Sequence, residues 1–221
     1  MKKAVIFDLD GTLLDTIDDL TDSVNFMLRT FGHPERTRDE VKSFVGNGAV
    51  KLIERSLPEK VDDEKFSERM AVYKEHYAKN QSNKTVPYDG VVELLRELKD
   101  MGVKTAVYSN KHDSAVQTLC EHYFKGLTDA VYGHRRDMPT KPAPDAIFEI
   151  GKEFGLEIVD MLYVGDSETD ILTGKNAGID TVAVTWGFRD RETLIKNGAY
   201  RFADTAEEIK EIVLDQRNNV K

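Results

Sequence analysis

Two aspartates, Asp8 and Asp10, follow directly on the apolar run at residues 4–7 near the start of the chain. In an extended chain, residues i and i+2 point to the same side, so both carboxylates can face one site, and Gly11 permits the turn that follows. Two close carboxylates repel each other unless one is protonated or a cation lies nearby. Because hard divalent cations such as Mg²⁺ prefer oxygen ligands, this spacing predicts a Mg²⁺ site.

A second acidic stretch follows the apolar run at residues 161–164. Asp166 comes directly after that run, and Asp170 lies one helical turn further on, so both side chains can reach the same place. Taken alone, Asp166 is equally well explained as a cap of the next helix. The presence of Asp8 and Asp10 at the end of another apolar run favours a single site at which the carboxylates converge.

Ser109 and Asn110 stand where the apolar run at residues 103–108 ends, and their hydroxyl and amide groups can donate hydrogen bonds to phosphate oxygens. Lys141 begins a Lys-Pro-Ala-Pro sequence, in which the prolines hold the chain extended and open a helix. A lysine held in this way can neutralise a phosphoryl group as a point charge. Each feature also has a simpler explanation, a helix cap or a solvated lysine, so neither identifies a phosphate site by itself.

These candidate residues adjoin apolar runs that are typical of strands buried on both faces of a parallel sheet. The expected strands, the last of them weaker, are Ala4–Phe7, Val103–Tyr108, Met161–Val164, Thr181–Thr185 and Tyr200–Ala203. Segments with helical spacing separate them, such as residues 91–98 before Gly102 and residues 147–154 before Gly155. Alternating strands and helices predict an α/β fold with a doubly wound, Rossmann-like parallel sheet, in which ligands bind outside the carboxyl ends of the strands.

Residues 15–85 interrupt this alternation, because they contain helical apolar stripes at residues 17–31 and 66–77 and no strand-like run. Thr37–Glu40 within the stretch, and Thr205–Glu208 near the C-terminus, have the spacing of capping boxes and predict two helix starts. We therefore expect an inserted α-helical domain of residues 15–85 and an α/β core of residues 1–14 and 86–221.

The composition of the chain disfavours several classes of protein. The 221 residues include 31 Lys and Arg against 40 Asp and Glu, which gives a formal net charge of −9 and disfavours nonspecific binding to nucleic acid. A hydrophobic content of 40% suffices for a packed core. No apolar stretch approaches the ~18 residues of a membrane helix, and the single cysteine, Cys120, excludes an internal disulfide. We expect a cytoplasmic monomer or homodimer whose partner is a small phosphorylated metabolite, with no nucleic-acid or membrane partner.

Four stretches, taken in order, resemble the motifs of the haloacid dehalogenase-like hydrolase superfamily over nearly the whole chain. Residues 8–13 resemble the first motif, Ser109 the second, Lys141 the third and residues 165–170 the fourth. The helical insertion resembles the α-helical cap of that family. A carboxylate at Asp10 is typical of the phosphatase and mutase branches and is missing from the dehalogenase branch, so the resemblance implies phosphoryl transfer.

The resemblance also implies a role for each residue. Asp8 would attack phosphorus and form an aspartyl-phosphate, while Asp10 would protonate the leaving oxygen and then deprotonate the attacking water. Mg²⁺ would be held by the Asp8 carboxylate, the Asp10 main-chain oxygen and Asp166, with Asp170 supporting the metal shell directly or indirectly. The charged Lys141 would also offset the developing charge. The side chains expected to hold phosphoryl oxygens are those of Thr12, Ser109, Asn110 and Lys141.

Within the superfamily, the nearest resemblance is to phosphoglycolate phosphatases. It rests on residues 11–16, on the sequence Thr185-Trp186-Gly187 and on the loop Gly46-Asn47-Gly48. The implied reaction is Mg²⁺-dependent hydrolysis of a small phosphate monoester, 2-phosphoglycolate. Backbone amides of Gly46 and Gly48 and the side chain of Asn47 would bind the substrate carboxylate, although a tight turn between helices explains the glycines as well.

Three other functions remain open. A β-phosphoglucomutase-like enzyme would use the same aspartates, but it usually carries a histidine soon after the first motif, and residues 16–23 contain none. An inorganic pyrophosphatase of the same fold is harder to exclude from the sequence than the mutase. A non-catalytic phosphate-binding regulator predicts loss of a catalytic carboxylate, whereas all four aspartates are present.

Overall fold

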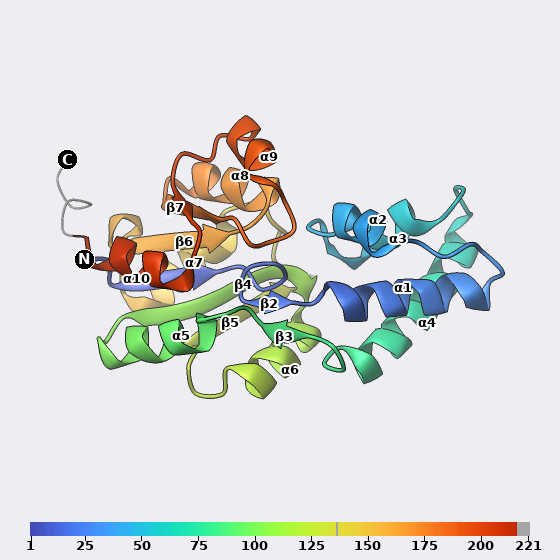
Figure 1. The fold of residues 1–221 in the computed structure, drawn as a ribbon, viewed down its shortest axis with the longest axis horizontal. Helices are drawn as coiled ribbons and strands as arrows, with labels where there is room; N and C mark the ends of the chain where they lie inside the picture. The colour runs from blue at the N-terminus through green and yellow to red at the C-terminus, as the bar shows by residue number, and fades with distance from the viewer. Residues whose placement is uncertain (136, 216–221) are drawn as a thin grey trace.

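A six-stranded sheet of order β5-β4-β1-β6-β7-β8 forms the centre of the protein (Figure 1). The structure is a computed structural model and describes residues 1–135 and 137–215. Each neighbouring pair of strands in this sheet is parallel, which confirms the predicted sheet. The strands are β1 Ala4–Phe7, β4 Lys104–His112, β5 Ala130–His134, β6 Met161–Gly165, β7 Asp180–Val184 and β8 Phe202–Ala203.

Helices cover both faces of the sheet because its central strands are apolar on both sides. Val5 and Phe7 of β1 point into one hydrophobic cluster, and Ala4 and Ile6 point into another. The first cluster includes side chains of α5 (Val91–Asp100), α6 (Asp113–Tyr123) and α10 (Ala206–Leu214). The second includes side chains of α7 (Asp145–Phe154) and α8 (Glu168–Ala177). The doubly wound arrangement is therefore confirmed.

A separate group of helices lies at the right of Figure 1, beyond one end of the sheet. These helices are α1 Ile17–Thr30, α2 Arg38–Phe44, α3 Gly48–Ser56 and α4 Asp63–Asn80. They share their own hydrophobic cluster, which includes Ile17, Val24, Ile53 and Tyr73. We call these four helices the cap. Its exact boundaries at residues 15 and 85 stay a prediction.

The chain enters and leaves the cap through a short antiparallel pair that the sequence did not predict. Leu14–Asp15 (β2) pairs with Val86–Pro87 (β3). Two residues are too few to give a recognisable alternation of apolar and polar side chains. The edge strand β5 was also missed, because Ala130–His134 is only partly buried and includes Gly133. Both omissions concern short strands that lack a continuous apolar run of four or more residues.

Two predicted boundaries need correction. Strand β4 continues to His112, so Ser109 and Asn110 lie inside the strand instead of after it. The predicted capping box at Thr37–Glu40 is complete, but that at Thr205–Glu208 is only half formed. Thr205 accepts a hydrogen bond from the Glu208 amide, whereas the Glu208 carboxylate accepts one from the amide of Asp204. The helix α10 begins where predicted.

Candidate active site

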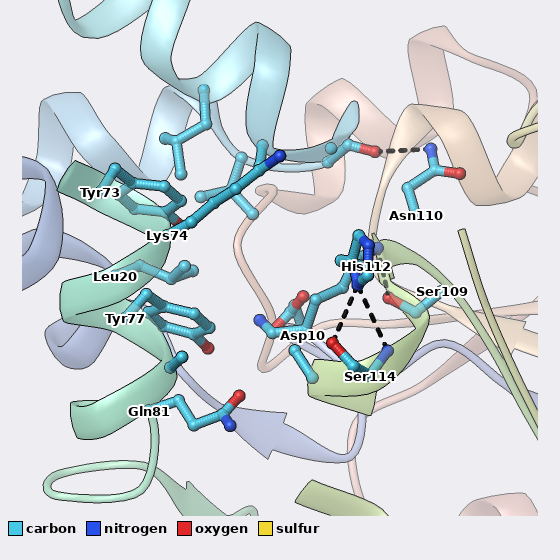
Figure 2. Close-up of a pocket in the computed structure, with 18 of the residues that line it drawn as sticks. Asp10, Leu20, Tyr73, Lys74, Tyr77, Gln81, Ser109, Asn110, His112 and Ser114 are labelled. Atoms are coloured by element: carbon cyan, nitrogen blue, oxygen red, sulfur yellow. Dashed lines mark hydrogen bonds and ion pairs between the residues drawn. The ribbon is translucent and has the colours of Figure 1, made fainter. Parts of the chain in front are cut away.

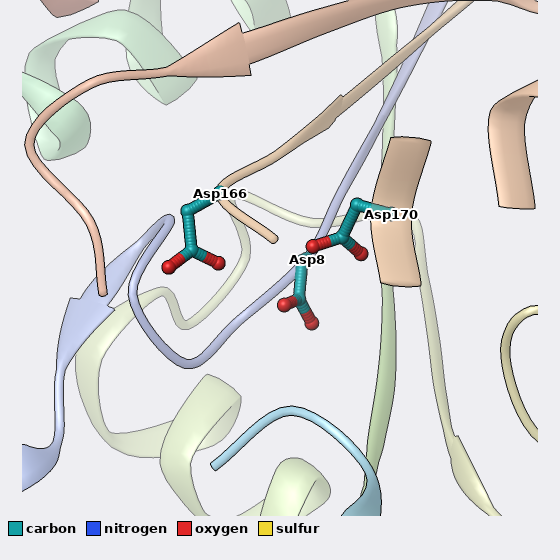
Figure 3. Close-up of side chains that lie close together, drawn as sticks. All are labelled: Asp8, Asp166 and Asp170. Atoms are coloured by element: carbon teal, nitrogen blue, oxygen red, sulfur yellow. The ribbon is translucent and has the colours of Figure 1, made fainter. Parts of the chain in front are cut away.

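Three carboxylates, those of Asp8, Asp166 and Asp170, lie at the carboxyl edge of the sheet with oxygens within 4.8 Å of one another (Figure 3). Asp8 follows β1 and Asp166 follows β6, and these two strands are direct neighbours. Asp170 belongs to the first turn of α8, and all three side chains are buried. Parallel pairing thus brings together residues that are far apart in the sequence.

One ammonium group lies among these carboxylates. Lys141 Nζ is 2.8 Å from Asp8 Oδ1 and 2.7 Å from Asp170 Oδ1, and its side chain is buried. Asn110 fixes the lysine backbone, since its Oδ1 accepts a hydrogen bond of 2.8 Å from the Lys141 amide and its Nδ2 donates one of 3.2 Å to the Lys141 carbonyl. The side chain of Asn110 therefore positions Lys141 in addition to facing the site.

Burial perturbs the ionisation of the cluster. Burial raises the pKa of Asp8 to about 7 although the neighbouring Lys141 lowers it. Burial and the nearby Asp170 and Asp8 hold the pKa of Asp166 well above its usual range. The pKa of Asp170 is lowered overall, because Lys141 and hydrogen bonds outweigh its burial. Three carboxylates share one ammonium, so full ionisation leaves two negative charges that a divalent cation would balance.

The donor set fits such a cation. Asp8 Oδ1 is buried and forms an ion pair of 2.8 Å with Lys141 Nζ without the geometry of a hydrogen bond, so the carboxylate keeps lone pairs for a cation. Asp166 is fixed on one side by the amide of Phe188, which donates a hydrogen bond of 2.6 Å to Oδ2. A Cβ atom at Gly11 or Gly187 would collide with the Asp166 side chain, so both glycines are needed for this close approach. Carboxylate oxygens held rigidly in this way suit Mg²⁺.

Asp170 has a different environment from the other two carboxylates. Its Oδ1 accepts hydrogen bonds from Lys141 Nζ and from the Tyr163 hydroxyl, both at 2.7 Å. Its Oδ2 accepts from the amide and the hydroxyl of Ser167. Because both oxygens are already occupied, the geometry favours Asp170 as a residue that orients Lys141 over a direct metal ligand.

Asp10 lies outside the three-carboxylate cluster. Its Oδ1 accepts hydrogen bonds of 2.6 Å from Thr16 Oγ1 and from Lys111 Nζ. Lys111 was not predicted as a site residue from the sequence. Ser109 and Lys111 are two positions apart in strand β4, so the alternation of side chains along a strand was the signal that could have identified it.

A cavity of about 370 Å³ lies between this cluster and the cap. Asp8, Asp10, Ser109 and Lys141 belong to its core side. Helix α4 forms the opposite side, where Figure 2 shows Tyr73, Tyr77 and Gln81 facing Asp10 and His112 across the space. None of Tyr73, Tyr77 and Gln81 was predicted as part of a site. The helical spacing of Tyr73 and Tyr77 predicted only core packing, and Gln81, the C-cap of α4, lies beyond that stripe.

The loop at residues 46–48 only partly matches its predicted role. Gly46 and Gly48 line the cavity. The prediction that Asn47 offers a side-chain donor to the substrate does not match the structure, because Nδ2 donates to Thr169 Oγ1 at 3.1 Å and Oδ1 accepts from Arg55 Nη2 at 2.8 Å. These neighbours satisfy the amide and turn it away from the cavity.

Thr12 is also placed differently from the prediction. Its hydroxyl donates to Asp166 Oδ1 at 3.5 Å, and Thr12 is not among the cavity-lining residues. The side chain is buried beside the carboxylate cluster. In this arrangement Thr12 contacts a candidate metal ligand instead of the space that a phosphoryl group would fill.

Arg189 joins the core to the cap. Its guanidinium donates to the carbonyls of Lys42 and Val45, at 3.0 and 2.6 Å, and pairs with Glu168. Asn110 Nδ2 adds a hydrogen bond of 3.1 Å to the Gly46 carbonyl. These contacts hold residues 42–46 of the cap over the core, and the pairing between such distant segments cannot be read from the sequence.

Comparison with known proteins agrees with this geometry. Residues 5–184 match the model of the haloacid dehalogenase-like hydrolases. Phosphoglycolate phosphatase 1 of Pseudomonas aeruginosa is 33% identical over 97% of this chain and 83% of its own length. The phosphoglycolate phosphatase of Pseudomonas syringae pv. tomato is 36% identical over 85% of this chain and 71% of its own length. A candidate phosphoglycolate phosphatase of Lactobacillus delbrueckii subsp. bulgaricus has a crystal structure that superposes with a TM-score of 0.90, at 38% identity, covering 98% of this chain and 100% of that one.

The chain therefore belongs to the haloacid dehalogenase-like hydrolase family, and it is a phosphatase. This confirms the resemblance drawn from the four motifs. Among the described residues, no helix is long and apolar enough to cross a membrane. The roles of the individual residues, the cytoplasmic location and the choice between monomer and homodimer stay predictions.

Proposed function

We propose that this enzyme hydrolyses a small phosphate monoester, 2-phosphoglycolate, with Mg²⁺ and through an aspartyl-phosphate intermediate. The observation that supports this most directly is the buried cluster of Asp8, Asp166 and Asp170 around Lys141 on the core side of a cavity. The choice of 2-phosphoglycolate as the substrate rests on the names of the two relatives from Pseudomonas.

In this proposal Asp8 is the nucleophile. Its carboxylate forms a bond to phosphorus while the bond from phosphorus to the leaving oxygen breaks, and Asp10 gives that oxygen a proton. Asp10 then takes a proton from water, whose oxygen attacks the phosphorus and releases inorganic phosphate from Asp8. The contacts of Asp10 with Thr16 and Lys111 hold its carboxylate in one orientation for both proton transfers.

Asp8, Asp166 and the main-chain oxygen of Asp10 would hold Mg²⁺, and Asp170 would act through Lys141. The bound cation supplies positive charge that offsets the repulsion between the carboxylate and the phosphate. Lys141 adds a buried ammonium beside the nucleophile, and Ser109 lines the cavity as a further donor to phosphoryl oxygens.

The experiment is steady-state hydrolysis of 2-phosphoglycolate by metal-stripped enzyme, with and without added Mg²⁺. We expect inorganic phosphate only with Mg²⁺, and we expect BeF₃⁻ to bind the wild type as a phosphoryl mimic. Parallel reactions contain pyrophosphate, or β-glucose 1-phosphate with a bisphosphate activator. A much higher kcat/KM for pyrophosphate, or efficient formation of glucose 6-phosphate, would contradict the proposed reaction.

A further inference from the structure

The cavity contains polar side chains that are buried and unpaired. Tyr77 Oη and Gln81 Oε1 accept or donate no hydrogen bond among the described residues. Both residues are only 6% exposed, and both line the cavity. In Figure 2 the Tyr77 hydroxyl and the Gln81 amide extend from the end of α4 into the space opposite Asp10. A buried polar group without a partner is unfavourable, so a ligand that supplies the partner gains binding energy there.

The location assigns these two groups to the leaving-group side of the site. Lys111 Nζ lies 2.6 Å from Asp10 Oδ1 and 4.8 Å from the centre of the Tyr77 ring. Tyr77 is thus one side chain away from Asp10, the residue proposed to protonate the leaving oxygen. Asp8 and Lys141 line the same cavity, and the phosphoryl group would bind beside them.

The cavity is larger than a two-carbon leaving group requires. Its volume of about 370 Å³ lies in the range of pockets that bind drug-sized ligands. Besides the polar groups, apolar side chains such as Leu20, Ala49 and Leu52 line it. A leaving group that reaches Tyr77 and Gln81 therefore combines a carbon chain with a remote polar group.

We propose that Tyr77 and Gln81 form a second subsite that binds a hydroxyl group of the leaving group, and that the enzyme hydrolyses hydroxylated phosphate monoesters longer than phosphoglycolate. The proposal rests on the phosphatase activity proposed above. A hydroxyl both donates and accepts, so it pairs with Tyr77 Oη and with either end of the Gln81 amide. A carboxylate only accepts, so it pairs with Tyr77 Oη or Gln81 Nε2 and leaves the buried Gln81 Oε1 without a donor.

The test compares n-alkyl phosphates with ω-hydroxyalkyl phosphates of the same length, from three to six carbons, as substrates of the wild type, Tyr77→Phe and Gln81→Leu. One neutral hydrogen bond changes kcat/KM by roughly 3- to 10-fold. We expect the wild type to prefer the hydroxylated member by that factor at one chain length at least, and each variant to lose the preference. Each variant should change kcat/KM for the alkyl phosphates and for phosphoglycolate by less than for the hydroxyalkyl phosphates.

Tyr200→Phe is the matched control, because Tyr200 is 70% exposed and lies outside this cavity. We expect it to keep the preference. We also expect the melting temperature of Tyr77→Phe to match or exceed that of the wild type, because the change removes an unpaired buried hydroxyl. A lowered melting temperature with equal losses on both series would indicate a structural role and overturn the subsite.

Equal rates for alkyl and hydroxyalkyl phosphates in the wild type would also overturn the subsite, as would hydrolysis of phosphoglycolate alone. In both cases the phosphatase function stands. If the wild type releases phosphate from none of these compounds, including phosphoglycolate, the proposed function fails and the subsite with it.

Discussion

The two sides of the cavity differ in how their polar groups are satisfied. On the core side, Asp170 uses both oxygens and Lys141 contacts two carboxylates. On the cap side, Tyr77 and Gln81 have buried polar atoms without partners among the described residues. The difference shows that the candidate catalytic groups are oriented by the protein itself, whereas the cap leaves groups for the ligand to satisfy. Substitutions on the core side should therefore lower activity on every substrate, whereas substitutions of Tyr77 or Gln81 should change the preference among substrates.

The largest effect is expected for Asp8→Asn on the core side. The change is nearly isosteric and removes the charge of the proposed nucleophile, so kcat should fall by more than about 10³-fold on every substrate. Circular dichroism should show an intact fold. Asp100→Asn, at an exposed position at the end of α5, is the matched control and should leave kcat unchanged. Substantial activity in Asp8→Asn would exclude covalent catalysis at this residue.

Removal of metal should also stop turnover on all substrates. Besides restoring activity, Mg²⁺ at about 100 times its dissociation constant should stabilise the fold by ~2.7 kcal/mol. For a chain of this size that corresponds to a rise in melting temperature of roughly 5–10 °C. Asp166→Asn keeps an acceptor for the Phe188 amide but loses a charge, so the shift should shrink strongly. Full turnover in excess EDTA would contradict the metal site. Ca²⁺ should inhibit, because its looser coordination positions the nucleophile poorly.

Lys141→Ala should affect both chemistry and stability, because it leaves Asp8 and Asp170 without their shared ammonium. We expect kcat/KM to fall by about 10²–10³-fold on phosphoglycolate and on an aryl phosphate alike. Breaking a buried ion pair costs about 3–5 kcal/mol, which should lower the melting temperature by roughly 6–20 °C in the absence of metal. If kcat/KM falls for phosphoglycolate alone, Lys141 contacts the leaving group and not the phosphoryl group.

The smallest effect is expected for Asn47→Ala, which tests the cap loop. Because the Asn47 amide binds Thr169 and Arg55, its loss should lower the melting temperature by a few degrees, since one hydrogen bond contributes roughly 1 kcal/mol. The change in kcat/KM should stay below about 3-fold and be equal for phosphoglycolate and an aryl phosphate. A selective loss of 10-fold or more on phosphoglycolate would restore the direct substrate contact that the sequence analysis predicted.

The sequence by itself determined the framework of the fold. The central strands β1 and β6 are continuous apolar runs because both of their faces are buried, so local composition identifies them. The carboxylates of Asp8 and Asp166 come directly after these strands, and adjacent parallel strands end at the same edge of a sheet. The position of the candidate site follows from that rule alone.

Only the tertiary structure decided how the remaining side chains are paired. Three sets of contacts join segments that are distant in the sequence. Lys111 contacts Asp10, Arg189 donates hydrogen bonds to the carbonyls of Lys42 and Val45, and Asn47 donates one to Thr169. On α4, Tyr77 has the spacing of a core residue, and its unpaired hydroxyl becomes visible only with the cavity beside it. Apolar burial leaves a periodic signal along the chain, whereas pairing between polar side chains depends on the distance and direction that folding creates.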